Sequence, residues 1–126
     1  TRGRTEPEKP YYATRGNSGR NLSLVVLVDR YTASAAEILA GALRDNRQIE
    51  LIGVTSFGKG SVQELENLNG GATLKITVAK WLTPKGESIS EHGLKPDVEI
   101  EFSDQDYQDQ KDPQLDKALE IVGQMK

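Results

Sequence analysis

Apolar residues gather in two short runs, at 22–28 and 49–54, in the first half of the chain. Runs of this kind, rich in Val, Ile and Leu and bounded by polar residues, are typical of strands buried on both faces. Between them, apolar residues recur at three- and four-residue steps from Ala35 to Leu43, which predicts a helix with one apolar face. The order strand, helix, strand favours a right-handed crossover that joins two parallel neighbours.

A different pattern follows these elements. Apolar and polar residues alternate from 72 to 78, which predicts a half-buried strand. The turn signal Asn-Gly-Gly at 69–71 pairs this strand with a second one at 61–66, so a hairpin is expected. A short edge strand is expected at 98–102.

The two ends of the chain are more polar than its middle. Residues 1–21 are rich in Arg, Gly, Pro and Ser, which indicates a loop or mobile tail. Residues 103–126 begin as a charged loop and end in a helix that Asp112 caps, with Pro113 at its first position. We therefore predict a core domain at 22–102 between these two segments.

Composition fits one globular domain and narrows the chemistry. The 126 residues include 16 basic and 19 acidic side chains, and this net charge of −3 gives no reason to expect nucleic-acid binding. The absence of cysteine excludes thiol nucleophiles and thiolate metal sites, and a single histidine, His92, argues against a zinc site. Because the sequence begins at Thr1 rather than Met, we expect a processed or cut-out fragment.

Ser34 stands where the first apolar run gives way to the helix. A serine there directs its hydroxyl to the open end of the sheet, and the N–H groups of the helix N-terminus suit an anion that forms beside it. Ser34 also opens the pattern Ser-Ala-Ala-Glu, a capping box in which Glu37 reaches back to the first residue. The residues alone leave both a nucleophile and a plain helix cap open.

Lys59 follows the second apolar run, in the loop 57–61 with the sequence FGKGS. If the two strands are neighbours, both loops leave the same edge of the sheet and Lys59 can meet Ser34. A lysine acts as a base only when its amine is neutral, and burial in apolar surroundings lowers the pKa of a lysine. Gln63 could hold that amine or bind a substrate backbone. An exposed loop lysine and an ordinary strand glutamine are the alternatives.

The same loop nearly matches the phosphate-binding motif G-x-x-x-x-G-K-[ST], beginning at Gly53. However, Gly60 stands where the motif needs a hydroxyl for magnesium, and the turn signal at 69–71 argues against the helix that must follow. A nucleotide site is therefore disfavoured.

Three segments together resemble the C-terminal processing peptidases, also called tail-specific or carboxyl-terminal proteases. They are VDRYTASAAEI at 28–38, a segment with the core FGKGSVQ at 53–63, and TPKGESI followed by GLKPDV at 83–98. The likeness covers about 22–102. The 25 residues from Ser34 to Lys59 and the further four to the glutamine match the catalytic spacing of that family.

The resemblance implies an α/β fold with the ββα spiral core of crotonases and Clp proteases, here as a partial domain. It implies that Ser34 is the nucleophile, Lys59 its general base and Gln63 the residue that orients the lysine. It also implies that the Ala35 N–H is an oxyanion donor. Asp45 aligns with a supporting acidic position, although its charged neighbours alone indicate a surface cluster.

For the whole protein the resemblance implies a serine endopeptidase that cleaves proteins near their C-terminus without a metal or organic cofactor. Such enzymes usually act outside the cytoplasm, in the periplasm or cell envelope. They usually carry an upstream PDZ domain that binds the C-terminal segment of the substrate, and an upstream glycine as second oxyanion donor. We expect neither within this chain, so the piece can hold the catalytic pair and still lack activity alone. A homo-oligomer stays open, and a catalytically silent protein-binding domain on the same core is the alternative function.

Overall fold

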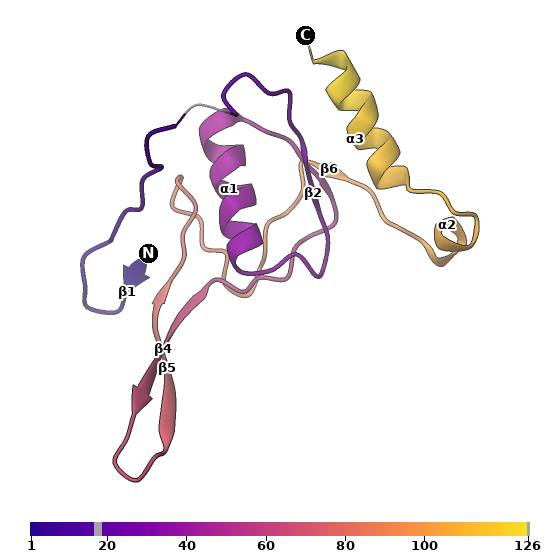
Figure 1. The fold of residues 1–126 in the computed structure, drawn as a ribbon. Helices are drawn as coiled ribbons and strands as arrows, with labels where there is room; N and C mark the ends of the chain where they lie inside the picture. The colour runs from indigo at the N-terminus through magenta and orange to yellow at the C-terminus, as the bar shows by residue number, and fades with distance from the viewer. Residues whose placement is uncertain (17–18, 126) are drawn as a thin grey trace.

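The computed structural model of the chain describes residues 1–16 and 19–125 (Figure 1). Residues 17 and 18 of the predicted tail and residue 126 of the predicted C-terminal segment therefore lie outside the described residues. The elements, in chain order, are β1 (Arg2–Gly3), β2 (Val26–Val28), α1 (Ala35–Arg47), β3 (Leu51–Gly53), β4 (Ser61–Asn67), β5 (Thr73–Lys80), β6 (Val98–Glu99), α2 (Asp104–Gln108) and α3 (Pro113–Gln124).

A small parallel sheet in the order β2-β3-β6 forms the centre of the molecule. Val26 lies opposite Leu51 and Val28 opposite Gly53, so β2 and β3 run side by side in the same direction, as predicted. The loops that follow these two strands therefore leave the same end of the sheet. In Figure 1 the sheet lies between α1 and α3.

The core gathers on the strands of this sheet and on one face of α1. Leu51 and Ile52 are fully buried at its centre. The predicted apolar face of α1 is only partly correct, because Leu39 is exposed while Glu37, Ala40 and Gly41 are the buried residues of the helix. The helix approaches its neighbours through small residues: a Cβ atom at Gly41 would stand 3.1 Å from a methyl group of Thr83.

The predicted hairpin is present as the antiparallel pair β4-β5, with β1 on the other edge of β5. It extends away from the rest of the molecule (Figure 1). The expectation that β5 is half-buried is wrong, since Leu74, Ile76 and Val78 are all exposed. The alternation of apolar and polar residues predicted the strand itself correctly. In the described part of the chain, however, no helix or strand covers its apolar face.

The C-terminal segment differs from the prediction in one element. Residues 104–108 of the expected charged loop form the short helix α2, which Ser103 and Asp106 cap reciprocally. Helix α3 begins as expected, because Asp112 accepts a hydrogen bond from the N–H of Leu115 at 2.9 Å. None of the helices in the described residues combines the length and the apolar character needed to cross a membrane.

Candidate active site

A tight polar turn carries the chain from β2 to Ser34. Asp29 Oδ1 accepts hydrogen bonds from the N–H groups of Tyr31 and Thr32, at 3.0 and 2.7 Å, and from the Thr32 hydroxyl at 2.8 Å. An aspartate that binds the backbone two and three residues ahead builds such a turn locally. The turn delivers Ser34 to the end of the sheet, at the start of α1.

Ser34 has a backbone conformation that favours glycine. Its φ of 56° and ψ of −117° lie outside the regions open to most L-residues. A residue held there stores about 1–3 kcal/mol of strain and persists only when its surroundings fix it. A serine on a strained turn between a strand and a helix is typical of hydrolase nucleophiles.

Ser34 is not an ordinary helix cap. The pair Ser34–Glu37 has the outline of a capping box, but only one arm is a hydrogen bond: the Glu37 carboxylate accepts from the Ser34 N–H at 2.9 Å. The helix makes no capping hydrogen bond to the Ser34 side chain, which is exposed.

The loop that carries Lys59 lies directly beside the Ser34 turn, as the parallel pair of strands predicts. The N–H of Phe57 donates a hydrogen bond to the carbonyl of Thr32 at 2.9 Å, which joins the two loops. Lys59 itself is exposed. The residues that the structure describes therefore do not enclose the lysine side chain in apolar surroundings.

Glu37 connects the two loops from inside the molecule. This side chain is fully buried, and its Oε2 atom accepts hydrogen bonds from the N–H groups of both Ser34 and Lys59, each at 2.9 Å. Both backbone nitrogens are thus fixed to one oxygen atom, and the structure brings the two candidate residues together through their backbones. The sequence pattern assigned Glu37 a capping role only. Ala40 and Gly41 follow it at three- and four-residue steps and so lie on the same helix face, and these small residues are the signal that could have indicated its burial.

The opposite side of the lysine loop packs against residues 89–94. The N–H of Glu91 donates to the carbonyl of Gly58 at 2.9 Å, and the N–H of Leu94 donates to the Ser56 hydroxyl at 2.7 Å. Gly60 is required here, because a Cβ atom at this position would stand 2.7 Å from the backbone nitrogen of Ser90. Contacts on both sides therefore hold the backbone of Lys59.

Ala35 directly follows Ser34, and Gln63 lies four residues beyond Lys59 on β4. Ala35 is the first residue of α1, and within the described residues its N–H has no hydrogen-bond partner. Gln63 is exposed on β4 opposite Thr77, next to an irregularity in the strand pairing. No hydrogen bond joins the side chains of Ser34, Lys59 and Gln63 in the part of the chain that the structure describes.

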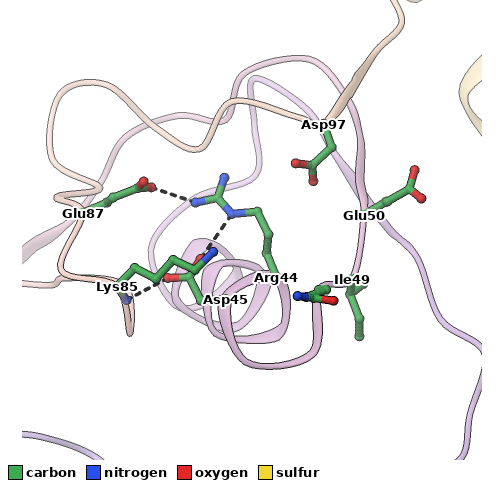
Figure 2. A pocket seen from close by; sticks show the side chains of 8 residues that line it. Arg44, Asp45, Ile49, Glu50, Lys85, Glu87 and Asp97 are labelled. Carbon is green, nitrogen blue, oxygen red and sulfur yellow. Dashed lines mark hydrogen bonds and ion pairs between the residues drawn. The ribbon is translucent and has the colours of Figure 1, made fainter.

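Asp45 lies at the other end of α1, about 16 Å along the helix axis from Ser34 at 1.5 Å per residue. Its side chain is 1% exposed and accepts a hydrogen bond from the N–H of Lys85 at 2.9 Å (Figure 2). Arg44 lies 3.5 Å from it and also contacts Glu87 at 2.9 Å. The structure thus gives Asp45 a place in an ion-pair cluster that holds the turn at 83–86, away from the two candidate catalytic residues.

The pKa of Asp45 reflects this environment. Burial raises it, but the nearby Thr83 hydroxyl, the Lys85 N–H and the positive charge of Arg44 outweigh burial and hold the pKa below its ordinary value. The Thr83 hydroxyl contributes although it falls short of full hydrogen-bond geometry. The carboxylate is therefore charged at neutral pH and serves as an anchor.

The described part of the chain offers little that would hold a small ligand or a metal ion. A hollow of about 430 Å³ opens beside Asp45 and is lined by charged groups of both signs (Figure 2). Within residues 1–16 and 19–125, no three His, Asp or Glu side chains converge where they could hold a metal ion.

Comparison with known proteins gives consistent matches. Carboxy-terminal processing protease CtpA of Bacillus subtilis (strain 168) is 54% identical over 80 residues, which are 64% of this chain and 17% of the relative. The solved structure of a photosystem II D1 C-terminal processing protease is 46% identical, with a TM-score of 0.56 over 60% of this chain and 20% of that chain. A crystal structure of the tricorn protease is 25% identical, with a TM-score of 0.67 over 79% of this chain and 10% of that chain.

These matches confirm the predicted α/β fold and the resemblance to C-terminal processing peptidases. The chain spans about a fifth or less of the length of the proteins named above. Residues 1–100 match the sequence profile of Peptidase family S41, which is well over half of the chain. The chain therefore belongs to peptidase family S41.

Proposed function

We propose that this chain carries the nucleophile and the general base of a serine endopeptidase that cleaves proteins near their C-terminus. The observation that carries the proposal is the Glu37 oxygen that accepts the N–H groups of both Ser34 and Lys59 at 2.9 Å. A base must reach the proton it removes, and this shared oxygen keeps the two residues adjacent.

The reaction follows from the chemistry of these groups. The neutral amine of Lys59 removes the proton of the Ser34 hydroxyl, and the oxygen attacks a backbone carbonyl of the substrate. The N–H of Ala35, which has no partner in the described residues, donates to the oxyanion of the tetrahedral intermediate. The lysine then protonates the leaving amine, and water releases the acyl-enzyme. In this proposal Gln63 orients the lysine amine.

The exposure of the site defines what this chain contributes. Ser34 and Lys59 are both exposed, whereas a lysine base needs an environment that favours its neutral form. We therefore assign the reacting groups to this chain and the second oxyanion donor to another part of the enzyme. The cover over the lysine would come from other parts of the enzyme or from the bound substrate. The much greater length of the relatives supports this division.

The printed names of the relatives suggest the substrate. The relatives named above include a carboxy-terminal processing protease and a protease that processes the C-terminus of the photosystem II D1 protein. By analogy we propose C-terminal segments of proteins as substrates. An upstream PDZ domain, a location outside the cytoplasm and a supporting role for Asp45 stay predictions.

The test is peptide hydrolysis by the natural protein that carries this sequence. Ser34→Ala and Lys59→Ala should each reduce kcat at least 1,000-fold, as loss of a nucleophile or base does, while the circular dichroism spectrum stays unchanged. Lys85→Ala, which removes another exposed lysine side chain, is the matched control and should retain activity.

A serine-reactive acylating probe separates the two candidate functions. It should label Ser34 in the unmodified protein and fail to label Ser34→Ala. Normal turnover in Lys59→Ala would contradict the lysine-base mechanism. Absence of both hydrolysis and labelling in the folded natural protein would favour the catalytically silent binding domain instead.

A further inference from the structure

The buried hydrogen-bond cluster behind Ser34 and Lys59 does more than cap a helix. Glu37 is fully buried, and its two carboxylate oxygens accept four hydrogen bonds in all. Oε2 binds the N–H groups of Ser34 and Lys59, and Oε1 binds the N–H of Gly58 at 2.7 Å and the hydroxyl of Ser56 at 2.5 Å. A carboxylate offers about four acceptor sites, so all of them are used.

Such an arrangement is costly to build for stability alone. Burying a charged carboxylate is unfavourable unless it is paired or fully hydrogen-bonded. No Arg or Lys side chain among the described residues forms an ion pair with Glu37. A plain capping glutamate needs one hydrogen bond and can stay in water, whereas Glu37 makes three bonds to a loop about 20 residues away.

Ser56 fixes the direction of this carboxylate. Its hydroxyl donates to Glu37 Oε1 and accepts from the N–H of Leu94 at 2.7 Å, and only 7% of the residue is exposed. The hydroxyl therefore has one donor and one acceptor partner, which allows a single orientation. Through it the carboxylate is tied to the segment that packs behind the lysine loop.

We propose that Glu37 and Ser56 are positioning residues that set the separation of the nucleophile and the base. Neither side chain is exposed to touch a substrate, so both act through the backbones of Ser34 and Lys59. The inference rests on the proposed function, because it gives these two residues their catalytic roles. It also accounts for the strained backbone of Ser34, whose N–H the carboxylate holds.

The chemistry of substitution gives graded variants. In Glu37→Gln the amide oxygen can still accept from Ser34 and Lys59, but the amide NH2 group then faces the N–H of Gly58, donor against donor. Ser56→Ala keeps the Glu37 carboxylate but removes the hydroxyl that fixes its direction through Leu94. Ser56→Thr keeps the hydroxyl and serves as the conservative rescue.

The experiment measures kcat, KM and the thermal midpoint of the natural protein with a peptide substrate. Because a displacement of about 1 Å can cost 100-fold in rate, Glu37→Gln and Ser56→Ala should lower kcat about 10- to 100-fold with KM unchanged. Ser56→Thr should restore kcat to within a few-fold. Asp97→Ala is the structural control, because it removes the carboxylate that accepts the N–H of Leu51 at 2.8 Å, at the far end of β3 from the lysine loop. It should lower the midpoint without changing kcat.

Each result decides the inference. Unchanged kcat in Ser56→Ala and Glu37→Gln, or a fall in kcat that Asp97→Ala reproduces at an equal loss of thermal midpoint, overturns the positioning role. If Glu37→Gln does not fold, Ser56→Ala decides alone, since that variant retains the buried Glu37 carboxylate and loses only the hydroxyl that orients it. Activity that survives in Ser34→Ala would instead overturn the proposed function itself, so the two failures are distinguishable.

Discussion

At the scale of single residues, the backbone of Ser34 differs from that of an ordinary helix cap and supports the proposed role as nucleophile. An ordinary N-cap serine has an extended backbone and accepts a hydrogen bond from the helix. Ser34 has a φ of 56° and no such bond. The surrounding hydrogen bonds hold a conformation that costs stability, which is a pattern more common at functional sites than at structural ones.

This strain makes a prediction about stability. Ser34→Gly should be more stable than Ser34→Ala by about 1 kcal/mol. Glycine adopts a positive φ without a steric penalty, whereas alanine has a Cβ atom and retains the penalty. The loss of the hydroxyl is common to both variants and cancels in the comparison. Chemical denaturation of the two variants measures the difference. Equal stabilities would mean that the conformation of Ser34 is not strained.

Sequence patterns identified Ser34 and Lys59 but not the role of Glu37. The two candidates follow buried strands, and parallel strands bring such loops together, so their adjacency could be predicted. The partners of Glu37, apart from Ser34, lie about 20 residues further along the chain. A local motif such as the capping box explains the glutamate so completely that nothing in the pattern indicates distant partners.

At the scale of elements, the two ends of α1 have different tasks. Its N-terminus presents Ser34 and the N–H of Ala35. Its C-terminus anchors the turn at 83–86, because Asp45 binds the N–H of Lys85 and Arg44 pairs with Glu87. Helix α1 thus links the candidate site to residues 83–94, the last part of which packs against the lysine loop. This link depends on the buried carboxylate of Asp45.

The lowered pKa of Asp45 predicts how this anchor responds to pH. A carboxyl group whose pKa is lower in the folded chain than in the unfolded chain stabilises the fold above the unfolded value of about 3.9, and this stability is lost as the pH falls further. Asp45→Asn should lower the free energy of unfolding at pH 7 by about 1 kcal/mol. The deficit should shrink as the pH falls from about 5 towards 3. Denaturation curves across this range measure it, and a constant deficit would contradict the assignment.

Element order was predictable, whereas the buried faces were less so. The pattern gave β2, α1, β3 and the hairpin, because strand runs and turn residues are local signals. It missed α2, whose cap of Ser103 and Asp106 is short and polar. It also placed Leu39 on the buried face of α1, since periodicity counts apolar residues and does not register that Ala40 and Gly41 allow closer packing.

At the scale of the whole molecule, the core and the hairpin are separate. The buried apolar residues lie mainly on the parallel sheet, on α1 and in residues 89–94. In contrast, β4 and β5 extend outward with apolar side chains in contact with solvent. The sequence could not distinguish these two situations, because a strand with one apolar face has the same alternation whether or not a second layer covers it. The site lies where the two parts meet, since β4 begins directly after the lysine loop.

This separation predicts unequal costs for substitutions at two apolar residues of similar size, one in the core and one on the hairpin. Leu51→Ala should lower the free energy of unfolding by about 2–5 kcal/mol, because the side chain is fully buried and leaves a cavity. Ile76→Thr should change it by less than about 0.5 kcal/mol, because the residue is 40% exposed on the hairpin and its replacement keeps the β-branched shape. Urea denaturation of residues 1–126 measures both. A large loss for Ile76→Thr would mean that the hairpin packs against the body of the chain, which would contradict its exposed position in the structure.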